Sequence, residues 1–161
     1  MQSRVRFAMR GLVLGVLVAV PVSADQEPGA PNGQYENFTG DDRRIRDKKT
    51  GLRWERSVSA SPVDFETAKS MCTGGLRLPT LKELLTLVDE QPHPAYDLKK
   101  NANVLKYIDR EAFGAETPID RAYWTSSMDG TSKAWTVDFG SGETVATPTV
   151  DGRYVRCVRF Q

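Results

Sequence analysis

Apolar and polar residues alternate in short runs at the start of the folded part of the chain. Between residues 44 and 54, two such runs flank a turn that ends at Gly51. Alternating runs on either side of a glycine-terminated turn are typical of a β-hairpin. Ile45, Leu52 and Trp54 hold its apolar positions, so we expect them to form the inward face.

Helical spacing replaces alternation after the hairpin. We expect Ser61 to be the N-cap of a first helix, with Pro62 at its first helical position. Thr80 and Glu83 have the spacing of a capping box, which predicts a second helix that Pro92 closes. The predicted apolar stripes are Phe65, Ala68, Met71 and Cys72 in the first helix, and Leu81, Leu84, Leu85 and Val88 in the second.

The segment that follows the second helix carries weaker signals. Residues 91–121 are expected to be rich in loops. Within this segment, residues 93–97 have the composition of a turn, and residues 104–113 have that of a short helix.

The C-terminal third alternates again, which predicts antiparallel strands. Val155 and Cys157 share one face of the last strand and are expected to lie against the core. Trp135, Val137 and Phe139 are expected to alternate inward. The predicted strands cover residues 123–126, 134–139, 143–146 and 153–160, with a turn at residues 140–142.

The N-terminus has a different pattern. Three arginines precede an uninterrupted small and apolar run over residues 11–20, and small residues follow Pro21. This is the pattern of a cleavable signal peptide over residues 1–24. The apolar run is far below the ~20 residues that span a bilayer, so we expect no transmembrane anchor after cleavage. Secretion or a periplasmic location follows from this prediction.

A hairpin, two helices, a loop-rich middle and antiparallel strands together indicate an α+β fold. The chain that remains after cleavage has the size of one domain. Residues 25–40 are rich in proline and glycine and are expected to form a flexible linker. Residues 41–161 are expected to form the folded domain.

The charge balance and the two cysteines bear on the partner class and on the disulfide bond. Three of the 22 basic residues lie in the predicted signal peptide, so 19 basic residues face 21 acidic ones in the exported chain. This slightly acidic balance argues against a nucleic-acid partner. Cys72 and Cys157 are an even count, and pairing is the default in an oxidising compartment, so we expect a disulfide bond.

A local basic cluster is the strongest candidate for a binding site. Basic residues crowd the first hairpin and recur on the last strand, and charge-assisted contacts from them would suit sulfates. The alternative is a solvated face, because acidic residues are interspersed. The candidate polyanion-binding residues are Arg43, Arg44, Arg46, Lys48, Lys49, Arg153 and Arg156, within a wider cluster that also contains Arg53, Arg56 and Arg159.

Catalytic chemistry has few residues to use. His93 is the only histidine of the chain, and a Ser-His-Asp triad or a multi-histidine metal site needs more than one residue in an expected turn. The stretch from Gln91 to His93 matches only part of the triplet with which lectins hold calcium, and it lacks the carboxylate. We therefore expect no enzymatic activity and no cofactor.

Five blocks, in this order, resemble one family. They are residues 47–54 (DKKTGLRW), 76–84 (LRLPTLKEL), 123–127 (YWTSS), 134–139 (AWTVDF) and 155–159 (VRCVR). Together they resemble the Lcl C-terminal domain family of exported bacterial proteins, over about residues 41–161.

The resemblance implies a C-type-lectin-like fold with a disulfide between the first helix and the last strand. It also implies a glycan partner, since one relative is a collagen-like adhesin that binds sulfated glycosaminoglycans. A protein of the cell envelope is the alternative partner. The block at residues 77–80 is also similar to one in formylglycine-generating enzymes, but the reactive cysteine pair of those enzymes is missing, and Arg77 is expected to be structural.

Overall fold

The structure is a computed structural model of the 161-residue chain. The predicted signal peptide (residues 1–24) and most of the predicted linker lie outside the described residues. The structure describes residues 30, 33–38, 41–97, 101–114, 117–119 and 121–160.

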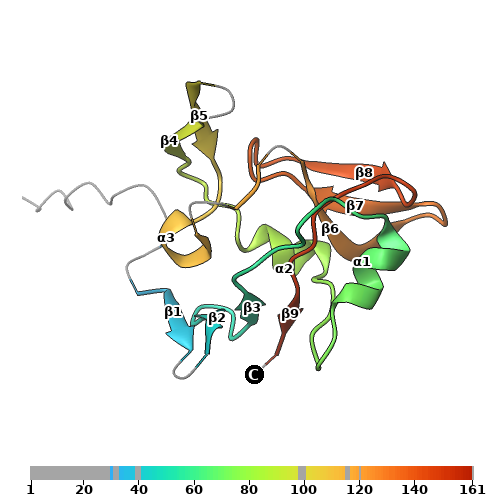
Figure 1. The fold of residues 1–161 in the computed structure, drawn as a ribbon, viewed down its shortest axis with the longest axis horizontal. Coiled ribbons are helices and arrows are strands. Elements are labelled where there is room, and N and C mark those ends of the chain that lie inside the picture. Colours follow the sequence, from blue (N-terminus) through green and yellow to red (C-terminus); the bar gives the residue numbers. More distant parts are fainter. Residues whose placement is uncertain are drawn as a thin grey trace, which may run out of the picture.

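The first sheet has four antiparallel strands in the order β1-β2-β3-β9 (Figure 1). The predicted hairpin is confirmed by β2 and β3, with Ile45 directly opposite Trp54. Ile45, Leu52 and Trp54 are buried, as expected. The strands are β1 (Tyr35–Phe38), β2 (Asp41–Asp47), β3 (Arg53–Glu55) and β9 (Val158–Arg159).

Strand β1 is a correction to the predicted linker, which covered residues 25–40. Residues 35–38 pair with β2. The ring of Tyr35 packs edge-on against the ring of Phe113, with 5.0 Å between the ring centroids. Burial among the carboxylates of Asp47, Asp109 and Asp89 raises the pKa of the Tyr35 hydroxyl. The packing of Tyr35 against the core therefore helps to order residues 35–38, whose composition predicts a linker.

The hairpin turn is fixed by Asp47, which is fully buried. Its carboxylate accepts hydrogen bonds from the Lys49 backbone N–H (2.9 Å) and from the Thr50 hydroxyl (2.5 Å). Gly51 then adopts φ +76°, a conformation that favours glycine. The turn thus satisfies its buried carboxylate internally.

The first helix, α1 (Phe65–Met71), begins later than expected. Asp64 is its N-cap and accepts from the Thr67 N–H, so the prediction of Ser61 and Pro62 at the start is wrong. The chain before Asp64 is extended because Val63 exchanges two backbone hydrogen bonds with Arg153. Phe65 and Ala68 are buried, whereas Met71 is exposed and Cys72 follows the helix as its C-cap.

The second helix, α2 (Leu81–Leu85), confirms the predicted capping box. It is shorter than predicted, since Thr86 ends it well before Pro92. The Thr86 hydroxyl donates to the Glu83 carbonyl (2.7 Å), and the chain turns so that Leu87 is buried instead of Leu85.

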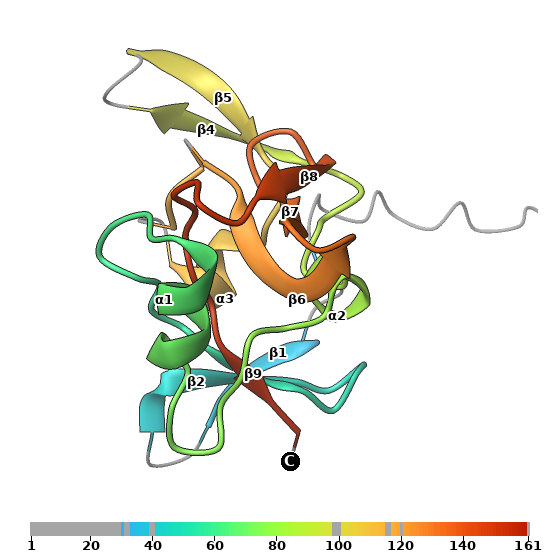
Figure 2. The same cartoon turned by 90° about the vertical axis from the view of Figure 1, so that its right-hand side faces the viewer.

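The middle of the chain departs most from expectation. The turn predicted at residues 93–97 is strand β4 (His93–Asp97), which pairs with β5 (Ala102–Lys106). Only the end of the helix predicted within residues 104–113 exists, as α3 (Arg110–Phe113). Figures 1 and 2 show the β4–β5 hairpin standing away from the rest of the fold.

The second sheet confirms three of the four predicted C-terminal strands, with antiparallel order β6-β7-β8. Val137 and Phe139 are buried as expected, but Trp135 is half-buried. The segment of residues 153–160 is mostly not a strand, and only β9 within it joins the first sheet. The strands are β6 (Tyr123–Asp129), β7 (Lys133–Val137) and β8 (Thr144–Pro148).

Two buried clusters hold these layers together. One lies between the first sheet, α2 and the inner side of the second sheet, around Trp54 and Phe139. The other lies under α1 and contains Phe65, Trp124 and Cys157. The fold is α+β with antiparallel sheets, short helices and one disulfide bond among the described residues.

Candidate functional site

Three arginines line up on the outer face of the first sheet. Arg46 on β2 lies directly opposite Arg53 on β3, and Arg53 lies directly opposite Arg159 on β9. Side chains on a strand alternate between its two faces, and the neighbours Ile45, Trp54 and Val158 are buried inside. The three guanidinium groups therefore share the opposite face. We call Arg46, Arg53 and Arg159 the arginine row.

Acidic residues border the row on two sides. Glu36 on β1 lies opposite Arg46, and their side chains form an ion pair at 3.3 Å. The Lys48 ammonium is 3.8 Å from the same carboxylate. In the next register, Arg44 lies opposite Glu55. The row is thus a cationic strip that ends at Glu36.

The register places like charges directly opposite one another along the row. Neighbouring strands lie about 4.8 Å apart, and like charges directly opposite one another are destabilising. The buried Nε atom of Arg159 has no hydrogen-bond partner among the described residues. A bound anion would offset this repulsion, because guanidinium groups form strong, charge-assisted hydrogen bonds with sulfates and carboxylates.

A further arginine, Arg77, lies beside β9 at the edge of the first sheet. Arg77 exchanges two backbone hydrogen bonds with Val158, and its guanidinium forms a two-pronged contact with Glu83 at 2.6 and 2.7 Å. Hydrogen bonds from Arg77 hold the pKa of the Glu83 carboxyl below its usual value. The exposed ring of Phe160 lies 5.5 Å from the Arg77 guanidinium. Arg77 is therefore structural, as expected, with one face left on an aromatic ring.

Arg156 corrects the predicted binding site, because it lies in the core with no exposed surface. Its Nη1 donates to the carbonyls of Glu55 and Arg56, both at 2.7 Å, and its Nη2 donates to the Thr117 hydroxyl. The guanidinium also stacks 4.9 Å from the ring of Phe113. Burial lowers its pKa to about 10, so it remains charged at neutral pH. It cannot reach a polyanion at the surface.

Other predicted residues lie apart from the row. The Arg153 guanidinium donates to the Gly152 carbonyl and forms an ion pair with the Asp151 carboxylate. Its side chain lines a hollow on the second sheet. Arg43 lies on β2, but alternation places it on the face opposite Arg44. Lys49 lies in the hairpin turn. Of the seven candidates, only Arg44, Arg46 and Lys48 lie on or beside the row.

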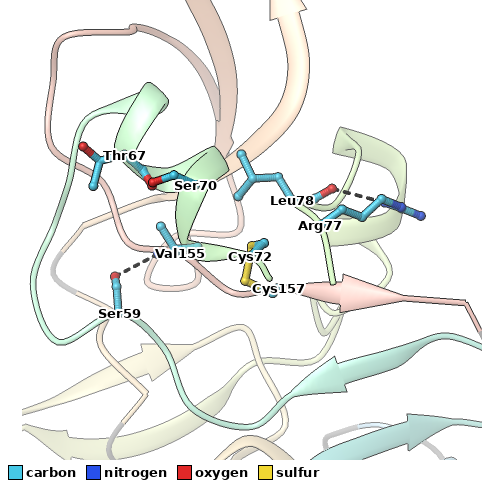
Figure 3. Close-up of a disulfide and its surroundings, with 8 residues drawn as sticks. All are labelled: Ser59, Thr67, Ser70, Cys72, Arg77, Leu78, Val155 and Cys157. Carbon is cyan, nitrogen blue, oxygen red and sulfur yellow. Dashed lines mark hydrogen bonds between the residues drawn. A yellow bond between two sulfur atoms is a disulfide. The ribbon is translucent and has the colours of Figure 1, made fainter. Parts of the chain in front are cut away.

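The expected disulfide between Cys72 and Cys157 is present, with an S–S distance of 2.04 Å. Figure 3 shows it joining the end of α1 to the segment that leads into β9. The Cys157 carbonyl accepts from the Glu55 N–H (3.0 Å), which brings β9 alongside β3. The bond therefore anchors the strand that contributes Arg159 to the row.

Within the described part of the chain, no three His, Cys, Asp or Glu side chains are grouped so that they could hold a metal ion. No helix among the described residues is long and apolar enough to cross a bilayer.

A family model for the Lcl C-terminal domain matches residues 43–159, which is more than half of the chain. The chain belongs to the Lcl C-terminal domain family. The matched span of this Lcl C-terminal domain includes all three arginines of the row and both cysteines. No curated protein matches the chain.

The sequence pattern places Arg53 and Arg159 in the wider basic cluster but does not mark them as site residues. The missing information was the strand register, which sets Arg53 between Arg46 and Arg159. A signal was present in the sequence, since each of the three arginines stands next to a buried apolar residue on a strand.

Proposed function

We propose that this Lcl C-terminal domain is an exported, non-catalytic module that binds an anionic polysaccharide along the arginine row. The observation that carries the proposal is the register of Arg46, Arg53 and Arg159 on one outward face. A ligand that crosses the strands meets a guanidinium about every 4.8 Å. Sulfate or carboxylate groups along a polysaccharide suit this arrangement, because each guanidinium offers a planar pair of donors.

A C-type-lectin-like architecture is part of the same proposal. Two short helices precede a protruding segment and a three-stranded sheet, and the chain ends beside its own first hairpin. The disulfide links the end of α1 with the last segment, as the family resemblance implies. This arrangement supports the lectin-like assignment without a calcium site.

Export to the periplasm or the cell exterior also belongs to the proposal. Stable disulfide bonds form in oxidising compartments, and the Cys72–Cys157 bond supports one here. The predicted signal peptide provides the route. The ligand would accordingly be an envelope or extracellular polysaccharide.

A protein partner is the second candidate, and one observation favours it. The β4–β5 hairpin exposes the side chains of Tyr96 (54%) and Leu105 (49%) while standing away from the fold. Exposed aromatic and aliphatic groups on a projecting hairpin are typical of protein contacts.

Binding to immobilised heparin and to neutral dextran separates the two candidates. The oxidised, exported protein should bind heparin in a salt-sensitive manner and should not bind dextran. Arg53→Ala should weaken heparin binding about tenfold, the equivalent of one charged hydrogen-bonding group. Arg43→Ala is the matched control, because it removes the same charge from the opposite face of β2. Equal losses in the two variants would contradict the proposal, and an absence of heparin binding at low salt would favour a protein partner.

A further inference from the structure

A hollow of about 320 Å³ lies on the second sheet, away from the arginine row. Figures 1 and 2 show the β6–β7–β8 sheet at the opposite end of the fold from β1 and β2. Helix α1 packs over one end of this face, where Trp124 and Ala134 are buried. Thr136 and Thr147 lie on the same face and line the hollow that α1 leaves uncovered.

The floor of the hollow accepts hydrogen bonds. The hydroxyls of Thr136 and Thr147 are 3.0 Å apart, and the Thr136 hydroxyl donates to the Val145 carbonyl at 3.0 Å. A hydroxyl has one hydrogen to give, so Thr147 must be the donor between the two threonines. The remaining lone pairs of the Thr147 oxygen can then accept from a ligand. The carboxylates of Asp138 and Glu143 line the same hollow and are also acceptors.

Two arginines, Arg121 and Arg153, also line the hollow. Arg153 is held in place by the Gly152 carbonyl (2.6 Å) and the Asp151 carboxylate (3.4 Å). Arg121 is exposed, and no side chain or carbonyl among the described residues forms a hydrogen bond or ion pair with its guanidinium. Arg121 can therefore turn to an anionic group on a ligand.

A close backbone approach lies beside the hollow, between Gly140 and Ile119. A Cβ atom on Gly140 would lie 2.7 Å from the Ile119 carbonyl oxygen, so only glycine fits there. The Gly140 N–H donates to the Asp138 carboxylate at 2.6 Å, which fixes that carboxylate beside the floor. The β7–β8 turn thus passes close to the backbone of Ile119, and its own hydrogen bond orients Asp138 in advance of any ligand.

We propose that this hollow binds a single acidic sugar residue. The sugar hydroxyls would donate to Thr147, Asp138 and Glu143, and the sugar carboxylate would accept from Arg121. Acceptors spread over the floor suit a ring with several hydroxyls, and the Arg121 guanidinium favours an acidic sugar over a neutral one. The lining of the hollow shares no residue with the arginine row, so either site can fail without the other.

The test is a titration of the ¹⁵N-labelled, exported protein with galacturonate, galactose and glutamate, followed by amide chemical shifts. Galacturonate should shift the amides of Thr136, Asp138, Gly140 and Thr147 at about 10 mM, above the millimolar Kd expected of one monosaccharide. Arg121→Gln should weaken binding about tenfold, and the isosteric Thr147→Val should weaken it severalfold.

The matched control is Arg46→Ala, which should leave these shifts unchanged because it alters only the arginine row. Three results would overturn the inference: equal binding of galactose, binding of glutamate in preference to galacturonate, or galacturonate shifts confined to β2, β3 and β9. The absence of any shift at 10 mM would overturn it as well. Heparin binding by Arg121→Gln should remain normal, so the two sites are judged separately.

Discussion

Arg53 lies directly opposite Arg159 across the antiparallel pair of β3 and β9. Two neighbouring contacts fix this register: the Glu55 N–H donates to the Cys157 carbonyl, and Arg77 exchanges backbone hydrogen bonds with Val158. The disulfide at Cys157 and the backbone contacts of Arg77 thus hold the like charges of Arg53 and Arg159 side by side. An anionic ligand along the row, as proposed, would give this arrangement a function.

Removing one charge from the row should stabilise the protein at low salt. Arg159→Gln retains much of the side-chain stem and relieves the repulsion with Arg53, for a gain of about 0.5 kcal/mol in the free energy of unfolding. The gain should shrink as salt screens the charges. Urea unfolding at two salt concentrations measures it. Destabilisation at both concentrations would show that Arg159 is an ordinary structural residue.

Arg156 should be needed for the stability of the fold, and it should make no contact with a ligand bound at the surface. Arg156→Met leaves the carbonyls of Glu55 and Arg56 without their donor and should cost about 3 kcal/mol. Arg153→Met is the comparison, because its ion pair with Asp151 is partly exposed and worth at most about 1 kcal/mol. Thermal or urea unfolding compares the two. Similar losses in both variants would contradict the assignment of Arg156 to the core.

The ion pair between Arg77 and Glu83 should stabilise the protein at pH values above the ordinary pKa of a carboxyl group. This stabilisation should be lost in acid. The pKa of Glu83 is lower in the folded protein than in the unfolded chain, so the unfolded state binds a proton first as the pH falls. Stability should therefore decline below about pH 5. Glu83→Gln should lower stability by about 1 kcal/mol at pH 7 and flatten this decline. An unchanged pH profile in Glu83→Gln would contradict the prediction.

The disulfide should contribute a large share of the stability. Cys72 and Cys157 are separated by 85 positions. Closing a loop of that length is worth about 4.5 kcal/mol in the chain-entropy model. Replacing both cysteines by serine should lower the free energy of unfolding by about that amount and weaken heparin binding through loss of the β9 register. A loss below about 1 kcal/mol would show that packing alone fixes the last segment.

Local signals predicted the parts of the fold that local physics decides. The Thr80–Glu83 capping box and the inward faces of Ile45, Leu52 and Trp54 depend on neighbours in sequence, and the structure confirms them. The N-cap at Ser61 failed because Val63 is held extended by Arg153, a residue 90 positions away.

The candidate site was predicted only in part for the same reason. A basic cluster was evident, but a list of charges does not say which side chains share a face. Arg156 has the same charge as Arg159, three residues later, yet one is buried in the core and the other lies on the sheet. The hollow around Thr147 carried no signal, because its residues come together from separate strands and loops.

The most direct test of the account compares two sets of three substitutions in the oxidised, exported protein. One set replaces Arg46, Arg53 and Arg159 by alanine, and the other replaces Arg43, Lys49 and Lys69, which removes the same net charge away from the row. The measurement is the salt dependence of heparin affinity. The account predicts that the first set abolishes binding and the second lowers it only slightly. Equal losses in both sets would contradict it, because net charge and not the row would then control binding.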